Sequence, residues 1–170
     1  MNIRNAHLND AAAITAIYNH FIRDTTITFE EQPLSVDQMG ARLQKILDTG
    51  FPYLVLEVDH EVMGYAYASP WHGRSAYRFT AESTIYLASP ATGKGFGRAL
   101  YRKLIERLKQ QGIKNVMGVI ALPNRPSVRL HESLGFNQVG EFHDIGFKFN
   151  RHISVGYWQL EIDASIRQRD

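Results

Sequence analysis

The chain has 170 residues, of which 44% are apolar, and its 19 basic and 17 acidic side chains give a formal net charge of +2. This length supports one hydrophobic core, so we expect a single domain over residues 1–170. The near balance of charge argues against nucleic-acid and membrane partners. The lack of cysteine excludes disulfides and cysteine nucleophiles, the seven histidines show no metal-ligand spacing, and no apolar run is long enough to span a membrane. We therefore expect a cytoplasmic protein that acts on a small molecule without a metal.

In chain order, the hydrophobic pattern alternates between helix and strand periods, without repeats or linkers. It predicts a strand at 1–6, helices at 9–22 and 35–47, two strands within 52–69 around a turn at 59–61, a strand at 80–88, a helix at 97–112, a strand at 114–122, a helix at 125–135 and two strands near 148–162. Ser35 and Gln38 have the spacing of a capping box at the start of the second helix. The order β-α-α-β-β-β-α-β-α-β-β predicts an α/β fold with a mixed sheet.

Three alternating glycines, Gly93, Gly95 and Gly97, lie between a predicted strand and a predicted helix in the stretch ATGKGFGRAL. Amides without a neighbouring Cβ, placed at a helix N-terminus, favour a phosphate group. The spacing matches neither the Rossmann turn nor the P-loop, since Lys94 is followed by glycine and not by Ser or Thr. We expect Arg98, the first basic residue of the helix, to reach the phosphate, while an ordinary turn is the alternative.

A carboxylate in the middle of a predicted strand is the main candidate for acid–base chemistry. Glu82 lies in the run TAESTIYL, where burial of a charge is costly unless the charge has a partner or a role. We interpret Glu82 as a general base, and a salt bridge to Arg78 or to another structural partner is the alternative. In the loop just before this strand, Arg74 has the planar fork that suits a carboxylate, although it is also compatible with an ordinary exposed loop.

Two motifs resemble the GNAT superfamily of N-acetyltransferases. The first is the glycine turn over 92–97, which departs from the family pattern at Thr92, where Arg or Gln is usual. The second is Asn124 followed by His131 and Gly135-Phe136, with His131 where many relatives have Tyr. The stretches AYRFTAESTIYL, GVIALPNRPSVRLHESLG and GYWQ resemble the phosphinothricin and methionine sulfoximine N-acetyltransferase branch, and the likeness runs from about 3 to 162 with departures at His152 and Ser154.

The resemblance implies a GNAT fold with helices on both faces of the sheet, and direct acetyl transfer from acetyl-CoA to the α-amino group of phosphinothricin, methionine sulfoximine or methionine sulfone. It implies that a homodimer forms and that Glu82 and His131 are catalytic. Cofactor contacts are expected from Ile85, Tyr86, Leu87, Gly93, Lys94, Gly95, Phe96, Gly97, Arg98, Asn124 and Ser133. Substrate contacts are expected from Phe29, Glu30, His72, Arg74, Glu82 and Thr84. The alternatives are an acetyltransferase for a protein N-terminus, a lysine or an aminoglycoside, and a non-catalytic sensor of acyl-CoA.

Overall fold

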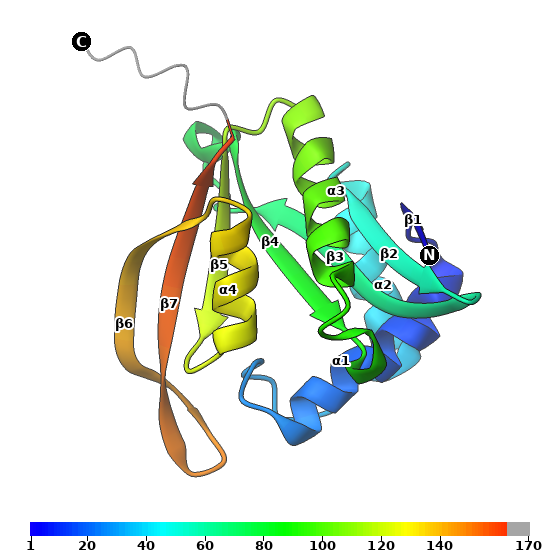
Figure 1. The fold of residues 1–170 in the computed structure, drawn as a ribbon, viewed down its shortest axis with the longest axis horizontal. Coiled ribbons are helices and arrows are strands. Elements are labelled where there is room, and N and C mark those ends of the chain that lie inside the picture. Colours follow the sequence, from blue (N-terminus) through cyan, green and yellow to red (C-terminus); the bar gives the residue numbers. More distant parts are fainter. Residues whose placement is uncertain (163–170) are drawn as a thin grey trace.

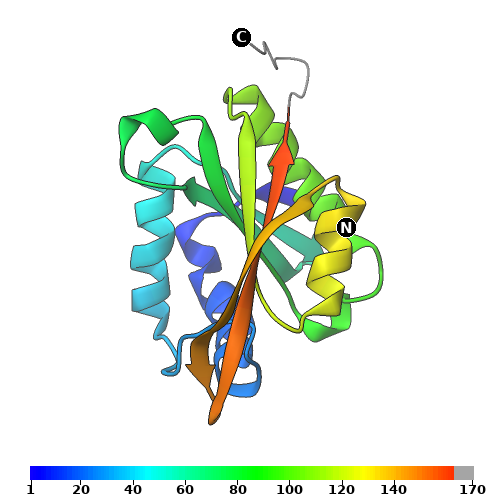
Figure 2. The ribbon, with the colours of Figure 1, turned by 90° about the vertical axis from the view of Figure 1, so that its left-hand side faces the viewer.

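A computed structural model describes residues 1–162 and arranges them as a seven-stranded mixed sheet between two layers of helices (Figure 1 and Figure 2). The strands are β1 (Asn2–Asn5), β2 (Tyr53–Val58), β3 (Glu61–Pro70), β4 (Thr80–Leu87), β5 (Asn115–Ala121), β6 (Asn137–Lys148) and β7 (Arg151–Glu161). The helices are α1 (Ala11–Asp24), α2 (Val36–Asp48), α3 (Phe96–Gln110) and α4 (Arg125–Ser133). The predicted element order and the mixed α/β sheet are confirmed.

The sheet has the strand order β1-β2-β3-β4-β5-β7-β6. Among the described strands, β4 and β5 are the one parallel pair, and every other pair is antiparallel. The helix α3 connects these two parallel strands, as a crossover between parallel neighbours requires. Two long chain segments therefore meet at the centre of the sheet, β1–β4 on one side and β5–β7 on the other.

The helices α1 and α2 cover one face of the sheet, and α3 and α4 cover the other (Figure 2). Ile14, Ile17 and Tyr18 of α1 are buried against the first face, as their spacing predicts. The capping box of Ser35 and Gln38 also forms as predicted. Met39 and Leu43 of α2 are buried, whereas Val36, which continues their apolar spacing towards the N-terminus, is the first residue of the helix and is 47% exposed.

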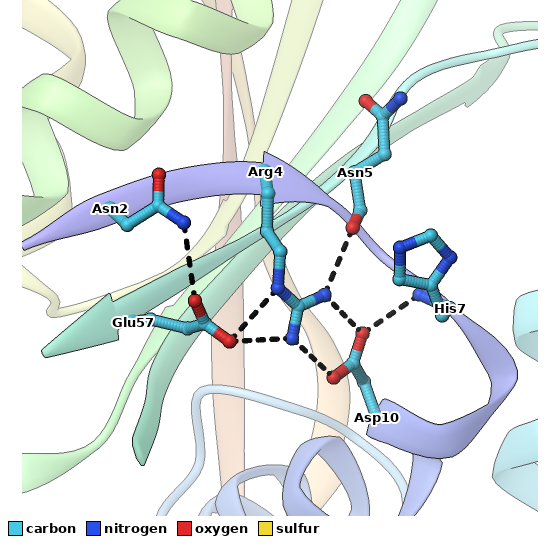
Figure 3. Close-up of polar contacts among 6 residues, drawn as sticks. All are labelled: Asn2, Arg4, Asn5, His7, Asp10 and Glu57. Atoms are coloured by element: carbon cyan, nitrogen blue, oxygen red, sulfur yellow. Dashed lines mark hydrogen bonds and ion pairs between the residues drawn. The ribbon is translucent and has the colours of Figure 1, made fainter. Parts of the chain in front are cut away.

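Arg4 of β1 forms hydrogen bonds with Asp10 and with Glu57 of β2 (Figure 3). The Arg4 guanidinium donates to both carboxylate oxygens of Asp10 at 2.8 Å and to Glu57 at 2.7 Å. The backbone N–H of His7 also donates to Asp10, at 2.8 Å. These contacts lower the pKa of the Asp10 carboxyl, chiefly through the hydrogen bonds from Arg4. The network connects β1, the turn that leads into α1, and β2.

The two hairpins differ in how well the sequence predicts them. The turn between β2 and β3 consists of Asp59 and His60, both with positive φ, as the predicted hairpin requires. The last hairpin is longer than predicted, because β6 begins at residue 137 and not near 148. Register shifts next to Gly140 and Gly146 interrupt its alternation, and most of its side chains are exposed on both faces. Strand prediction depends on a regular alternation of apolar and polar residues, and β6 lacks it because both of its faces are exposed and its register shifts.

Candidate active site

The central parallel strands separate halfway along their length. β4 and β5 are paired from Thr80 opposite Asn115 to Ser83 opposite Gly118, and the pairing stops there. β4 remains paired with β3 as far as Leu87. The main-chain groups of β4 beyond Ser83, which include those of the predicted cofactor contacts Ile85–Leu87, therefore have no strand partner on the β5 side and are available to a ligand.

A cavity of about 310 Å³ opens where the strands diverge, and we call it the splay cavity. It is lined by Ile27, Thr28 and Phe29 of the connection between α1 and α2, by 82–86 of β4, by 119–121 of β5, by Asn124, Ser127 and His131 at α4, and by Val155 of β7. Seven of the predicted site residues are thus brought together from distant parts of the chain: Phe29, Glu82, Thr84, Ile85, Tyr86, Asn124 and His131.

Glu82 is the acidic side chain that lines the splay cavity. Its carboxylate forms no hydrogen bond or ion pair with another residue in 1–162, and Arg78 instead donates to the carbonyl of Ser75 and stacks on Phe79. The alternative of a structural ion pair with Arg78 is therefore wrong. Burial raises the pKa of Glu82, and the nearby His72 opposes that shift. A half-buried carboxylate without a partner, with a raised pKa, has the properties of a general base.

His131 is 4% exposed, and both of its ring nitrogens have partners. Nδ1 lies 2.8 Å from the carbonyl oxygen of Ser127, which can only accept, so Nδ1 carries a hydrogen. Burial lowers the pKa of His131 and keeps the ring neutral, so Nε2 accepts from the Tyr101 hydroxyl at 3.0 Å. The Tyr101 hydroxyl also lies 2.6 Å from the Ser83 hydroxyl, which is itself 3.1 Å from the carbonyl oxygen of Met117. This chain of hydrogen bonds joins α4, α3 and β4 beside the cavity, and sequence reasoning did not include Tyr101 or Ser83 in it.

The glycine turn borders a second cavity, of about 390 Å³, which we call the turn cavity. Gly93 and Gly95 have φ of +73° and +79°, so these positions need the left-handed conformation that glycine adopts easily. Gly97 has an ordinary φ, but a Cβ there would lie 3.0 Å from the Leu87 side chain. α3 begins directly after this turn, at Phe96, one residue before the predicted start. The turn therefore presents free amides at a helix N-terminus, as the sequence predicts.

The turn cavity and the splay cavity have several lining residues in common: Ile27, Ile85, Tyr86, Asn124 and Ser127. Arg98 and Leu87 also line the turn cavity, as expected. Asn124 caps α4, since its side-chain oxygen accepts from the N–H of Ser127. Three other predicted cofactor contacts do not line this cavity: Lys94 is exposed, Phe96 packs on the core, and the hydroxyl of Ser133 donates to Leu130.

Three predicted substrate contacts lie outside the splay cavity. Glu30 accepts hydrogen bonds from Tyr18 and Arg42 and lines a neighbouring cavity. His72 and Arg74 are exposed in the loop before β4, where with Tyr77 they line a separate shallow pocket. His72 is still close enough to Glu82 to act on its pKa. The side chains of this loop therefore flank the cavity without lining it.

The segment that covers the splay cavity is held by the last hairpin. The Phe29 ring packs against the backbone of Gly146, where an added Cβ would lie 2.3 Å from the ring. The Lys148 ammonium donates to the carbonyl of Thr28 at 2.8 Å, and Lys148 is 1% exposed. His152 and Ser154, the two departures from the family pattern, both contact Asp144 in this hairpin. Sequence reasoning missed Lys148, because an isolated lysine near a strand end is usually a solvated charge.

Within 1–162 no group of three or more His, Cys, Asp or Glu side chains is placed to hold a metal ion. No helix in the same range is long and apolar enough to cross a membrane.

Comparison with known proteins places this chain and its fold in one family. The family model of the acetyltransferase (GNAT) domain matches residues 3–155. A phosphinothricin N-acetyltransferase of Streptomyces viridochromogenes is 40% identical over 169 residues, which cover 99% of this chain and 92% of that protein. An L-methionine sulfoximine/L-methionine sulfone acetyltransferase of Salmonella typhimurium is 34% identical, with 96% of this chain and 95% of that protein covered.

A solved phosphinothricin acetyltransferase from Sinorhizobium meliloti, in complex with acetyl-CoA, has a TM-score of 0.91 and 37% identity and covers 94% of this chain and 87% of that one. The chain belongs to the GNAT acetyltransferase family. It is an N-acetyltransferase whose relatives include phosphinothricin and methionine sulfoximine acetyltransferases.

Proposed function

We propose that the protein transfers the acetyl group of acetyl-CoA directly to the α-amino group of a small amino-acid analogue, with Glu82 as general base. The substrate class is that of the relatives: phosphinothricin, methionine sulfoximine and methionine sulfone. The observation that carries the proposal is the position of Glu82, an unpaired carboxylate in the cavity where the backbone of β4 leaves β5.

Acetyl-CoA is the proposed donor because the two connected cavities match its two ends. The amides of Gly93 and Gly95 and the Arg98 guanidinium would hold the pyrophosphate at the start of α3. The unpaired main chain at Ile85–Leu87 and the amide of Asn124 would bind the pantetheine arm. The thioester would then reach the splay cavity, where the β4 main chain can polarise its carbonyl.

In the proposed reaction, the acceptor nitrogen forms a bond to the thioester carbon, and the bond from that carbon to sulfur breaks. The proton released from the nitrogen goes to Glu82, directly or through a water. The departing thiolate lies on the α4 side of the cavity. There the neutral His131 can share its Nδ1–H between Ser127 and the sulfur, which stabilises the thiolate by a hydrogen bond.

The acceptor carboxylate is proposed to bind Arg74 in the loop before β4. Arg74 is exposed and forms no ion pair within 1–162, so its guanidinium is free to donate two parallel hydrogen bonds to the acceptor carboxylate. Phe29 and Thr84 line the splay cavity together with Glu82, and His72 is close enough to Glu82 to act on its pKa. The remaining predicted contact, Glu30, would act from the neighbouring cavity.

We also propose that the chain is one domain over 1–170 that works as a cytoplasmic homodimer. The edge strand β6 supports the dimer, because Val139, Phe142, Ile145 and Phe147 are each more than half exposed. An apolar edge of this kind favours a second copy over water. Sedimentation of the wild type and of Phe142→Glu tests this part: loss of a dimer in the variant is expected, and a monomeric wild type would refute it.

The experiment for the proposed activity is thiol release from acetyl-CoA with a panel of acceptors. Methionine sulfoximine, methionine sulfone and phosphinothricin should react. A peptide N-terminus, a lysine side chain and an aminoglycoside should not. Reaction with only the peptide, the lysine side chain or the aminoglycoside would show that the substrate class is that acceptor and not an amino-acid analogue. Binding of acetyl-CoA without any thiol release would favour a non-catalytic sensor.

A further inference from the structure

A third cavity, of about 340 Å³, lies between α2 and the strands β2 and β3. We call it the tyrosine cavity. Its lining consists of Tyr18, Glu30, Met39, Arg42, Lys45, Ile46, Thr49, Tyr53, Tyr65, Tyr67, Ser69 and Pro70. It has no lining residue in common with the splay cavity, and the proposed function gives a role to Glu30 but to none of the tyrosines that line it.

Three tyrosine rings form one wall of this cavity. Tyr53 stacks on Tyr67 with centroids 4.9 Å apart, and Tyr65 is nearly parallel to Tyr67 at 6.4 Å. Tyr53 and Tyr65 are 4% and 2% exposed, yet neither hydroxyl has a hydrogen-bond partner among residues 1–162. Neither hydroxyl oxygen is among the fully buried atoms that lack a partner, and both residues line the cavity, so a ligand there can reach these oxygens. An apolar wall with two unsatisfied hydroxyls fits a ligand with an apolar stem and an accepting oxygen.

The mouth of the cavity is cationic on one side. Arg42 pairs with Glu30, and their side chains are 50% and 34% exposed. Lys45, one turn further along α2, forms no ion pair within the part of the chain that the structure describes. Positive charge at the mouth favours a ligand end that is electron-rich or anionic.

The tyrosine cavity and Glu82 are adjacent on one face of the sheet. Ser69, which lines the cavity, is paired with Glu82 across β3 and β4. Tyr67 is paired with Thr84 in the same way. Directly opposed residues of antiparallel strands have Cβ atoms about 4.5–5.5 Å apart. A ligand whose amine is at Glu82 can therefore extend past Ser69 towards the tyrosine rings.

On the basis of the proposed function, we infer that the tyrosine cavity receives the side chain of the amino-acid acceptor. The occupant is an apolar stem that ends in a hydrogen-bond-accepting oxygen, such as a sulfone, sulfoximine or phosphinate group. The hydroxyls of Tyr53 and Tyr65 donate to that oxygen, and the rings enclose the stem. Selection by these hydroxyls would make the enzyme prefer oxidised or phosphinyl side chains over plain aliphatic ones.

The test is a Tyr53→Phe/Tyr65→Phe double variant, which removes both oxygens and keeps both rings. Its kcat/KM is measured with L-methionine sulfone and with L-norleucine, whose side chain lacks the accepting oxygens. Two lost hydrogen bonds should lower kcat/KM for the sulfone by roughly tenfold or more, while the value for norleucine should change by less than about twofold. If norleucine reacts too slowly, its inhibition constant against the sulfone is the readout. An equal change in kcat/KM for the sulfone and for norleucine, or no change for either, would overturn the inference.

A second variant fills the cavity. Ile46→Trp should lower kcat/KM for the sulfone by at least about tenfold. It should leave unchanged both kcat/KM for glycine, which has no side chain to enter the cavity, and the affinity for acetyl-CoA. Val36→Trp is the matched control, because Val36 is exposed on the same helix and does not line the cavity. Unchanged sulfone turnover in Ile46→Trp would also overturn the inference. If the wild type releases no thiol with any amino acid, the proposed function fails. If the wild type does release thiol with an amino acid and the variants behave as wild type, the proposed function stands and only the assignment of the tyrosine cavity fails.

Discussion

The hydroxyl of Tyr101 lies 3.0 Å from Nε2 of His131, on the opposite side of the ring from the carbonyl oxygen of Ser127, which can only accept and therefore places the hydrogen on Nδ1. With Nδ1–H facing Ser127, Nε2 has a lone pair, and Tyr101 donates to it. Because burial lowers the pKa of His131, the neutral ring should persist as the pH falls through the ordinary histidine range.

The first prediction follows from this geometry. Two-bond ¹H–¹⁵N spectra should find His131 in the neutral Nδ1–H tautomer between about pH 6 and 8, without the titration near 6.5 of an ordinary histidine. Tyr101→Phe should reduce this tautomer preference and lower the free energy of unfolding by about 1–3 kcal/mol, since Ser83 and His131 lose a buried partner. A wild-type His131 that titrates at its ordinary pKa would contradict the assignment.

The second prediction concerns the glycine turn. Gly95→Val should weaken acetyl-CoA binding by at least about tenfold in calorimetry, because a β-branched residue resists the left-handed conformation that aims the turn amides. Gly112→Val is the matched control: it has a φ of +80°, also with no atom within 4 Å of the added Cβ, and does not line the turn cavity. Equal loss of affinity in both variants would indicate general strain and remove the turn from the cofactor site.

The third prediction concerns the covering segment. Lys148→Met keeps the stem and removes the ammonium, so Thr28 loses its donor and the segment over the splay cavity is held less firmly. We expect KM for the acceptor to rise on the order of tenfold, with acetyl-CoA affinity unchanged. Lys109→Met, at an exposed lysine of α3, should have no effect. If KM is unchanged in Lys148→Met, the hairpin does not position the segment.

The fourth prediction is one of stability against pH. The pKa of Asp10 is lower in the folded protein than in the unfolded chain. Its carboxylate therefore adds to the free energy of unfolding above the unfolded pKa, and this stabilisation is lost as the pH falls through the folded pKa. Arg4→Met should therefore cost about 1–3 kcal/mol at neutral pH. The difference from wild type should shrink below about pH 4. A gap that stays constant down to pH 2 in denaturant unfolding would show that Arg4 acts through packing and not through Asp10.

Much of the fold was predictable because its elements have regular periods. The stripe of Ile14, Ile17 and Tyr18 and the glycine turn both depend on local sequence, and both form as expected. The start of β6 was not predictable, because bulges interrupt its alternation.

The site was only partly predictable, since it depends on which distant residues meet. Sequence reasoning placed Glu82 and His131 at the site, but the contact of His131 with Tyr101 of α3, and that of Tyr101 with Ser83 of β4, depend on how the helices pack. Glu30 was expected beside the acceptor amine, yet it faces Arg42 on α2. Side-chain direction in an irregular connection is set by tertiary contacts, which one sequence does not reveal.

The central claim is that Glu82 takes the proton of the acceptor amine, and the most direct measurement is the pH dependence of kcat/KM for methionine sulfoximine in the wild type and in Glu82→Gln. Burial raises the pKa of Glu82, and a base acts only when deprotonated, so wild-type kcat/KM should fall with an apparent pKa above that of an ordinary glutamate as the pH is lowered. In Glu82→Gln this limb should disappear and turnover should drop by roughly 10²–10⁴-fold, while calorimetry finds the same affinity for acetyl-CoA. Wild-type turnover in Glu82→Gln across the whole pH range would contradict the account.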